Sequence, residues 1–175
     1  PQMRQRCFEL LEQSARTSAA KLKFFRLAYG AGGGFGEKVS IDEPRAVIET
    51  LAADAKRIEL GWQIETPTVP KAATKVLLNL AQIGLDALVR GGTLDLGVEE
   101  RDDATEIVVR AAGAKIAFDQ TIGDALAGRM DPAELTGRTA PAHVLAMIAE
   151  RQGGMIQTHV ESGTLLLGAT LPNGA

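Results

Sequence analysis

Apolar or small side chains recur in the first 30 residues at alternating steps of three and four. The positions are Phe8, Leu11, Ala15, Ser18, Leu22, Phe25 and Tyr29. This spacing is typical of a helix in a bundle, and Pro1 suits a first helical turn. The glycines after Tyr29 end the helix. Because such a stripe must be covered, we expect either a second copy or a preceding helix to pack against it.

Beyond residue 37 the pattern alternates between strand and helix periods. Strands are predicted at 37–41, 58–66, 93–100, 105–112, 155–162 and 163–172, and helices at 42–57, 69–92 and 140–154. Asp42 is the expected N-cap of its helix, Gly91 and Gly92 are expected to close the second helix, and the last hairpin turns at Gly163. Residues 112–138 are less regular. This order predicts an α/β fold, a two-layer α/β sandwich with its helices on one face of a mixed sheet, preceded by a long bundle helix.

Residues 31–37, AGGGFGE, join the two parts. A glycine-rich loop can cradle phosphates, but no predicted strand precedes this one and no Gly-Lys-Ser/Thr follows it. We therefore interpret the segment as a linker. The predicted organisation is a bundle helix at 1–30, a linker at 31–37 and an α/β domain at 38–175.

Composition narrows the setting. The chain has 175 residues, of which 45% are hydrophobic and 23% charged, as in ordinary globular proteins. Every apolar stretch is too short to span a bilayer, and no secretory signal is recognisable. Cys7 is the single cysteine, so no internal disulfide can form. We expect a cytoplasmic protein, with Cys7 as a small buried side chain beside the bundle seam.

Charge is distributed unevenly. Residues 1–30 hold six basic and two acidic side chains, whereas the remainder holds 13 basic and 20 acidic ones. A basic helix on an acidic body suits an acidic protein surface, a phosphate or a nucleic acid as partner, although a solvated helix face would show the same pattern.

The predicted helix at 69–92 carries Asn79, Gln82 and Asp86 on an otherwise apolar face. Amide and carboxylate oxygens suit a hard cation such as Mg²⁺. The face is therefore either a nucleotide and metal site or the remnant of one, and a structural polar face is the further alternative.

A bundle helix followed by this sandwich resembles the core of a histidine kinase, with its ATP-binding domain of the GHKL type. In that family an N-box places a metal-binding Asn where this chain has Ile83. A later Asp-x-Gly-x-Gly motif is reduced to Gly113, with Ala111 at the Asp position, and the last glycine loop keeps only Gly137. The resemblance therefore implies a domain of the histidine-kinase ATPase type with a degenerate nucleotide site, whose remnant is Asn79, Gln82, Asp86 and Gly113, without a metal.

The chain is similar to the ChpT-like histidine phosphotransferases in residues 14–31, 60–65, 76–92 and 147–156. The resemblance implies a homodimer with a four-helix bundle that passes phosphoryl groups between the receiver domains of a hybrid histidine kinase and of response regulators. The receivers supply Mg²⁺, so no cofactor of its own is expected. Neither a nucleic acid nor a membrane is an expected partner.

The phosphoacceptor histidine of that family lies on the first bundle helix, which we expect to be absent from this sequence. Only His143 and His159 occur, and neither lies in the predicted bundle helix. We therefore assign no catalytic residue to this chain. Lys21, Lys23 and Arg26 lie off the seam and are predicted to dock the acidic receiver. The alternatives are an ATP-binding histidine kinase fragment and a non-catalytic receiver-binding scaffold.

Overall fold

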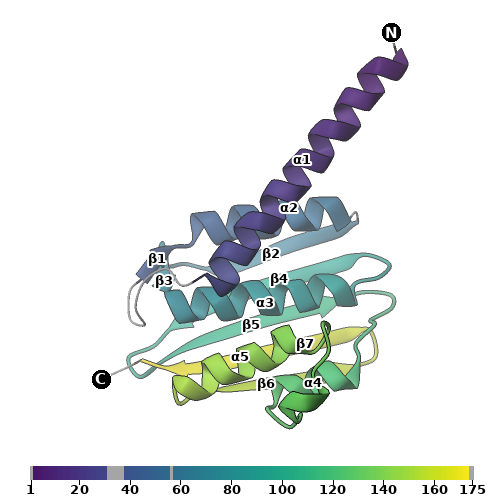
Figure 1. Cartoon of the computed structure of the whole chain (residues 1–175). Helices are drawn as coiled ribbons and strands as arrows, with labels where there is room; N and C mark the ends of the chain where they lie inside the picture. Colours follow the sequence, from purple (N-terminus) through teal and green to yellow (C-terminus); the bar gives the residue numbers. More distant parts are fainter. Residues whose placement is uncertain (1, 31–37, 56, 174–175) are drawn as a thin grey trace.

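The computed structural model describes residues 2–30, 38–55 and 57–173. The helix predicted at 1–30 is α1, Gln2–Tyr29, and it extends well beyond the rest of the molecule (Figure 1). The predicted linker at 31–37 lies outside the described residues. No helix in the described part of the chain combines the length and the apolar character needed to cross a membrane.

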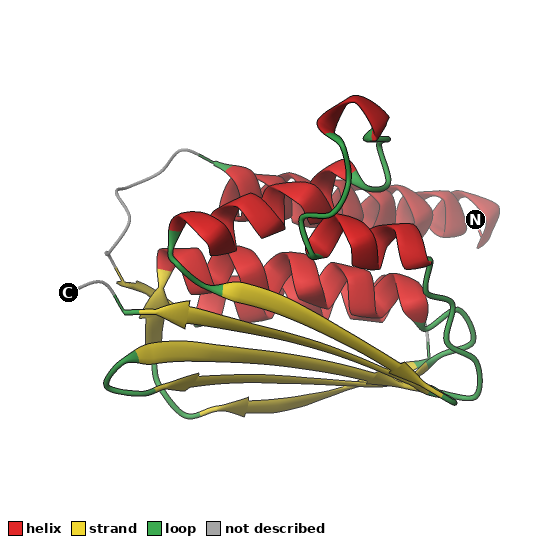
Figure 2. Ribbon diagram, turned by 90° about the horizontal axis from the view of Figure 1, so that it is seen from below, coloured by secondary structure: helices red, strands yellow, loops and turns green. Residues whose placement is uncertain are grey.

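The body is a mixed five-stranded sheet with helices on one face (Figure 2). Its strands, in spatial order, are β2 (Ile58–Ile64), β4 (Gly92–Glu100), β5 (Ala104–Ala112), β7 (Thr164–Pro172) and β6 (Met155–Glu161). Strands β2 and β4 pair in parallel, and the other neighbours are antiparallel. The covering helices are α2 (Asp42–Ala55), α3 (Lys71–Ala87), α4 (Gln120–Leu126) and α5 (Ala140–Arg151). The predicted two-layer α/β sandwich is confirmed.

Helix α3 forms the centre of the core because it is apolar on almost every side. Leu77, Leu78 and Leu80 are completely buried between the sheet and the neighbouring helices. Gly84 allows the close approach to the sheet, since a Cβ at this position would lie 2.6 Å from Leu94 Cδ1. The polar side chains of this helix are thereby confined to the face that points away from the sheet.

Several predicted boundaries were wrong. Strand β1 (Lys38–Ser40) pairs with β3 (Thr68–Pro70) in a separate two-stranded sheet, and β3 was not predicted. Helix α3 begins at Lys71, after the extended Pro70, and ends at Ala87, before Gly91 and Gly92 turn the chain into β4 with positive φ. Asp42 is the first residue of α2, and Ser40 Oγ accepts a hydrogen bond from its amide.

The stretch at 112–138 is more ordered than its sequence pattern indicates. It holds α4 and a 3₁₀ turn at Pro132–Glu134, and an aspartate caps each. Asp119 accepts bonds from the Thr121 hydroxyl and amide, which lower the pKa of its carboxyl, and Asp131 accepts from the Ala133 amide. Both elements are too short to show a hydrophobic period.

The two faces of α1 differ in burial. Ala20, Phe24 and Ala28 are buried against α2 and α3. The seam, defined as Phe8, Leu11, Ala15, Ser18, Leu22, Phe25 and Tyr29, is largely exposed, with Leu11 65% and Leu22 71% accessible. Cys7 is exposed as well, so the expectation that it is buried was wrong. None of the described residues packs over the part of α1 around Cys7.

Candidate functional site

A cavity of about 950 Å³ lies between the C-terminal half of α1 and the α/β domain. Its walls come from α1, the end of α2, the polar face of α3, and the segment from Ala117 to Ala142. Phe24, Phe25 and Tyr29 form an aromatic cluster on the α1 side, with ring centroids 5.8 to 6.4 Å apart. Phe118 lines the opposite side. The size is that of a small-molecule pocket.

Three of the four residues predicted as a nucleotide-site remnant meet in this cavity. Asn79, Gln82 and Asp86 all line it, as does Ile83. Their spacing on α3 places them on successive turns of one face, as the sequence predicted. Among the described residues, no three His, Cys, Asp or Glu side chains lie close enough to hold a metal ion.

Asn79 is 4% exposed, and both ends of its amide are bonded. Its Oδ1 accepts a hydrogen bond from the Tyr29 hydroxyl, and its Nδ2 donates to the carbonyl of Lys75 at 2.9 Å. Burial raises the pKa of Tyr29, so the phenol stays protonated as a donor. The amide therefore holds α1 against α3.

Gln82 and Asp86 form a pair further along the same face. Gln82 Nε2 donates to Asp86 Oδ1 at 2.9 Å. Burial raises the pKa of the Asp86 carboxyl, and the bond from Gln82 and the charge of Arg138 oppose that shift in part. This end of the cavity thus holds a partly desolvated carboxylate with a cation nearby.

Gly113 does not line the cavity. Its amide donates to the Gly163 carbonyl at 2.9 Å, and a Cβ at this position would lie 2.6 Å from the Gly91 carbonyl oxygen. Gly113 therefore permits close packing between the loops that flank β4, β5 and β7. Its location gives it a packing role apart from the other three residues.

The predicted docking cations lie on two different sides of α1. Lys21 lines the cavity, whereas Lys23 lines a separate groove of about 250 Å³ between α1 and α2. Arg26 forms an ion pair with Glu43 of α2. All three side chains are exposed, but they do not share one face of the helix.

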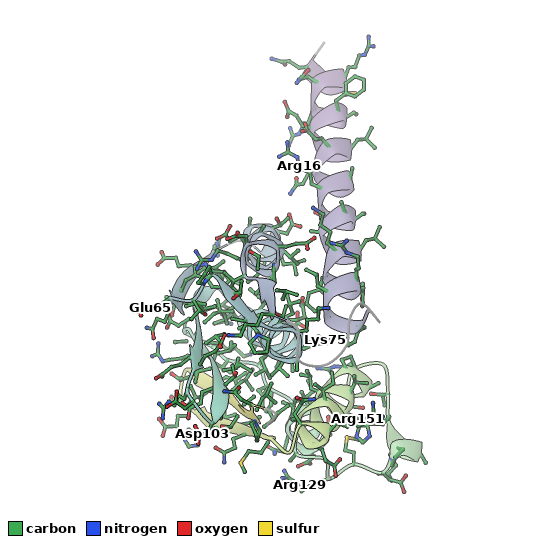
Figure 3. All side chains as sticks on the ribbon, turned by 90° about the vertical axis from the view of Figure 1, so that its left-hand side faces the viewer. Arg16, Glu65, Lys75, Asp103, Arg129 and Arg151 are labelled. Carbon is green, nitrogen blue, oxygen red and sulfur yellow. The ribbon has the colours of Figure 1, made fainter. Side chains whose placement is uncertain are left out.

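Other contacts that sequence reasoning missed attach α1 to the domain. Lys75 Nζ donates to the Gly30 carbonyl at 2.9 Å, and Figure 3 shows Lys75 beside the C-terminal end of α1. The Thr17 hydroxyl donates to Asp54 at 2.6 Å. A signal for Lys75 was available, because it lies one turn before Asn79 on the polar face of α3.

Neither histidine belongs to the cavity or to α1. His143 is half-buried in the first turn of α5, and its amide donates to the Thr139 carbonyl. His159 is exposed on β6, with Nε2 2.9 Å from Glu161 Oε1. Both histidines thus lie outside the bundle helix, as the sequence predicted.

The sequence of this chain is similar to those of known proteins. The family model described as "Histidine phosphotransferase C-terminal domain" matches residues 41–164. The chain is 26% identical over 160 residues to "Protein phosphotransferase ChpT" of Brucella abortus (strain 2308), covering 91% of this chain and 76% of that protein.

Solved structures show the same fold. A structure described as "a Bacterial Phosphotransferase" has a TM-score of 0.80 at 24% identity, covering 94% of this chain and 78% of its own. The catalytic domain of the histidine kinase ThkA has a TM-score of 0.59 at 16% identity, covering 81% of this chain and 98% of its own. The histidine-kinase-like architecture predicted from sequence is therefore confirmed.

Proposed function

The chain belongs to the histidine phosphotransferase C-terminal domain family, and from this premise we propose that it serves a bacterial phosphorelay as a histidine phosphotransferase. In this proposal it exchanges phosphoryl groups with the receiver domains of a hybrid histidine kinase and of response regulators. The relative from Brucella abortus, described as a protein phosphotransferase, supports the assignment.

One observation favours a phosphotransferase over an ATP-dependent kinase. Asn79 is one of the polar residues of α3 that line the cavity, and each end of its amide already makes a hydrogen bond, to the Tyr29 hydroxyl and to the Lys75 carbonyl. Ile83, which also lines the cavity, offers no oxygen to a cation. We propose that the chain binds no nucleotide and that the receiver supplies Mg²⁺.

The exposed seam of α1 supports a homodimer. A helix with Leu11 and Leu22 this exposed needs a partner, because their apolar surface is otherwise left in water. We propose that the protein is a homodimer with a four-helix bundle. The seam of α1 packs inside this bundle, and a second type of helix in the bundle carries the phosphoacceptor histidine. The single unpaired cysteine suits a cytoplasmic protein.

The reaction then follows from positioning. An imidazole nitrogen attacks the phosphorus of a receiver aspartyl phosphate in line, so that the N–P bond forms as the bond to the aspartate oxygen breaks. The imidazole gives up a proton, and the receiver carboxylate leaves with the electron pair. The rigid bundle contributes the alignment of these atoms.

Phosphotransfer can be measured directly. The protein expressed from its complete reading frame is mixed with receiver domains phosphorylated by acetyl phosphate, and each component is followed by Phos-tag gels. We expect an acid-labile phosphoryl group to appear on the protein. Labelling by ATP alone, or binding of Mg²⁺-ADP with micromolar affinity in calorimetry, would support the kinase alternative instead. Binding of receivers without any phosphoryl exchange would support a non-catalytic scaffold.

The docking assignment has its own test. Replacing Lys21 and Lys23 with Glu should slow receiver association by about tenfold at low salt, because an acidic receiver is no longer steered towards α1. Lys115→Glu is the control, since Lys115 is exposed on the α/β domain and lines neither the cavity nor the groove. Unchanged association kinetics in stopped-flow measurements would reject Lys21 and Lys23 as docking residues.

A further inference from the structure

The C-terminal end of α1 meets α3 through a small group of polar contacts. Lys75 and Asn79 lie one turn apart on α3 and both reach this end of the helix. Asn79 accepts from the Tyr29 hydroxyl, and Lys75 Nζ donates to the Gly30 carbonyl. The two residues are joined to each other, since Asn79 Nδ2 donates to the Lys75 carbonyl.

The contact made by Lys75 satisfies a backbone carbonyl at the end of α1. The last carbonyls of a helix lack partners within the helix and carry partial negative charge. Lys75 brings an ammonium group to the carbonyl of Gly30, directly after the last helical residue. It acts as a C-terminal cap that is donated by another helix. Lys75 can cap the Gly30 carbonyl only while the end of α1 stays next to α3.

Of these contacts, the hydrogen bond between Tyr29 and Asn79 is the most costly to break, because Asn79 is buried. Asn79 is 4% exposed, so its carbonyl oxygen has lost most of its access to water. An amide oxygen buried without a donor is costly, and a donor that moves away leaves it in that state. By contrast, the pair between Arg26 and Glu43 is solvent-exposed, and exposed pairs constrain geometry weakly.

We infer that Tyr29, Lys75 and Asn79 form a latch that fixes the angle between α1 and the α/β domain. Given the proposed function, Asn79 is a positioning residue for phosphoryl transfer: it acts through Tyr29 on the helix that a receiver contacts. At Asn79, the polar face of α3 bonds to a helix, while Gln82 and Asp86 further along the face line the cavity.

The latch predicts a narrow distribution of helix-to-domain distances. Spin labels are attached at Glu9→Cys on α1 and Glu150→Cys on α5, both exposed, in a Cys7→Ser background. Labelled chains are diluted with unlabelled chains, so that an assembly holds one labelled copy. Double electron–electron resonance then gives the distance distribution. We expect Tyr29→Phe and Asn79→Leu to widen it at least twofold.

Two further variants separate the latch from a loss of stability. Lys75→Met keeps the apolar stem but removes the cap, and it should widen the distribution even where Asn79→Leu fails to fold. Asn79→Asp retains an acceptor for the Tyr29 hydroxyl and should stay closer to the unmodified width than Asn79→Leu. Gln82→Ala is the matched control, because Gln82 lines the same cavity but bonds only within α3.

Transfer kinetics complete the test. In single-turnover transfer from a phosphorylated receiver at saturating concentration, the latch variants should be at least tenfold slower, and Gln82→Ala should match the unmodified protein. Unchanged distance distributions in Tyr29→Phe and Lys75→Met would overturn the latch, as would an equal widening in Gln82→Ala. A protein that exchanges no phosphoryl group with any receiver would overturn the proposed function, while the distances would still decide the latch.

Discussion

The two halves of α1 have the same helical backbone but different surroundings. From Gln2 to Arg16 every side chain is exposed, including Phe8 and Leu11. From Thr17 onward the helix contacts its own domain, and Phe24 is 6% exposed. One half is therefore stabilised within the chain, whereas the other presents an apolar surface that the described residues leave uncovered.

This difference arises from two stripes on one helix. Ala20, Phe24 and Ala28 recur at steps of four and face α2 and α3, with no counterpart in the N-terminal half of the helix. The seam runs the whole length at steps of three and four, along a different face. An exposed stripe beside a buried one indicates a helix that serves two interfaces at once.

The largest expected effect comes from Phe24 in the stabilised half. Phe24→Ala should lower the free energy of unfolding by about 3 to 4 kcal/mol, because it empties a buried site between α1 and the domain. Leu10→Ala is the control on the same helix, since its side chain is 58% exposed and lies off the seam, and it should cost less than about 1 kcal/mol. Urea unfolding followed by circular dichroism measures both. Equal costs would mean that α1 is not docked through Phe24.

The next prediction concerns the exposed half. Leu11→Asp should weaken self-association about thirtyfold, or about 2 kcal/mol, because it puts a charge into the seam. Leu10→Asp is the control: its side chain is 58% exposed against 65% for Leu11, but it lies off the seam. Sedimentation equilibrium of each variant gives the constants. A monomeric unmodified chain, or equal weakening by both variants, would contradict a seam-mediated dimer.

Sequence patterns were most reliable where elements are long and periodic. The alternation in β5 and β7 and the helical period of α3 predicted the sheet and its cover. Strand β3, with three residues, and α4, with seven, are too short to reveal a period. Whether β1 joins the main sheet depends on its partner β3, which local sequence does not specify.

The candidate site was predictable only in part, because local spacing does not show which distant segments come into contact. The spacing of Asn79, Gln82 and Asp86 placed them on one face of a helix, and the structure confirms their convergence. The spacing could not show that Tyr29, assigned to the seam, turns its hydroxyl to Asn79. Gly113 was grouped with them by resemblance, although its backbone contacts are to Gly91 and Gly163. Contacts between distant segments depend on the packed fold.

The smallest expected effect tests the cavity that separates the stabilised half of α1 from α3. Burial raises the pKa of Asp86, so folding favours its neutral form and its charge destabilises the fold at pH 7. The carboxylate also lies in the last turn of α3, where the helix dipole disfavours negative charge. Asp86→Asn should therefore stabilise the fold at pH 7 by a few tenths of a kcal/mol, since the site is partly solvated.

This gain should shrink as the pH falls through the raised pKa of Asp86, and it should vanish below its ordinary value, where the carboxyl is neutral in both the folded and the unfolded chain. Thermal unfolding from pH 7 down to pH 3.5 would show this convergence. Glu134→Gln on the exposed turn at Pro132–Glu134 is the control, and no comparable gain is expected from it. A loss of stability in Asp86→Asn at pH 7 would mean that the attraction to Arg138 outweighs burial. Asp86 and Arg138 would then form a stabilising charged contact in the wall of the cavity. The C-terminal half of α1 would accordingly face a more polar surface than the burial of Phe24 implies.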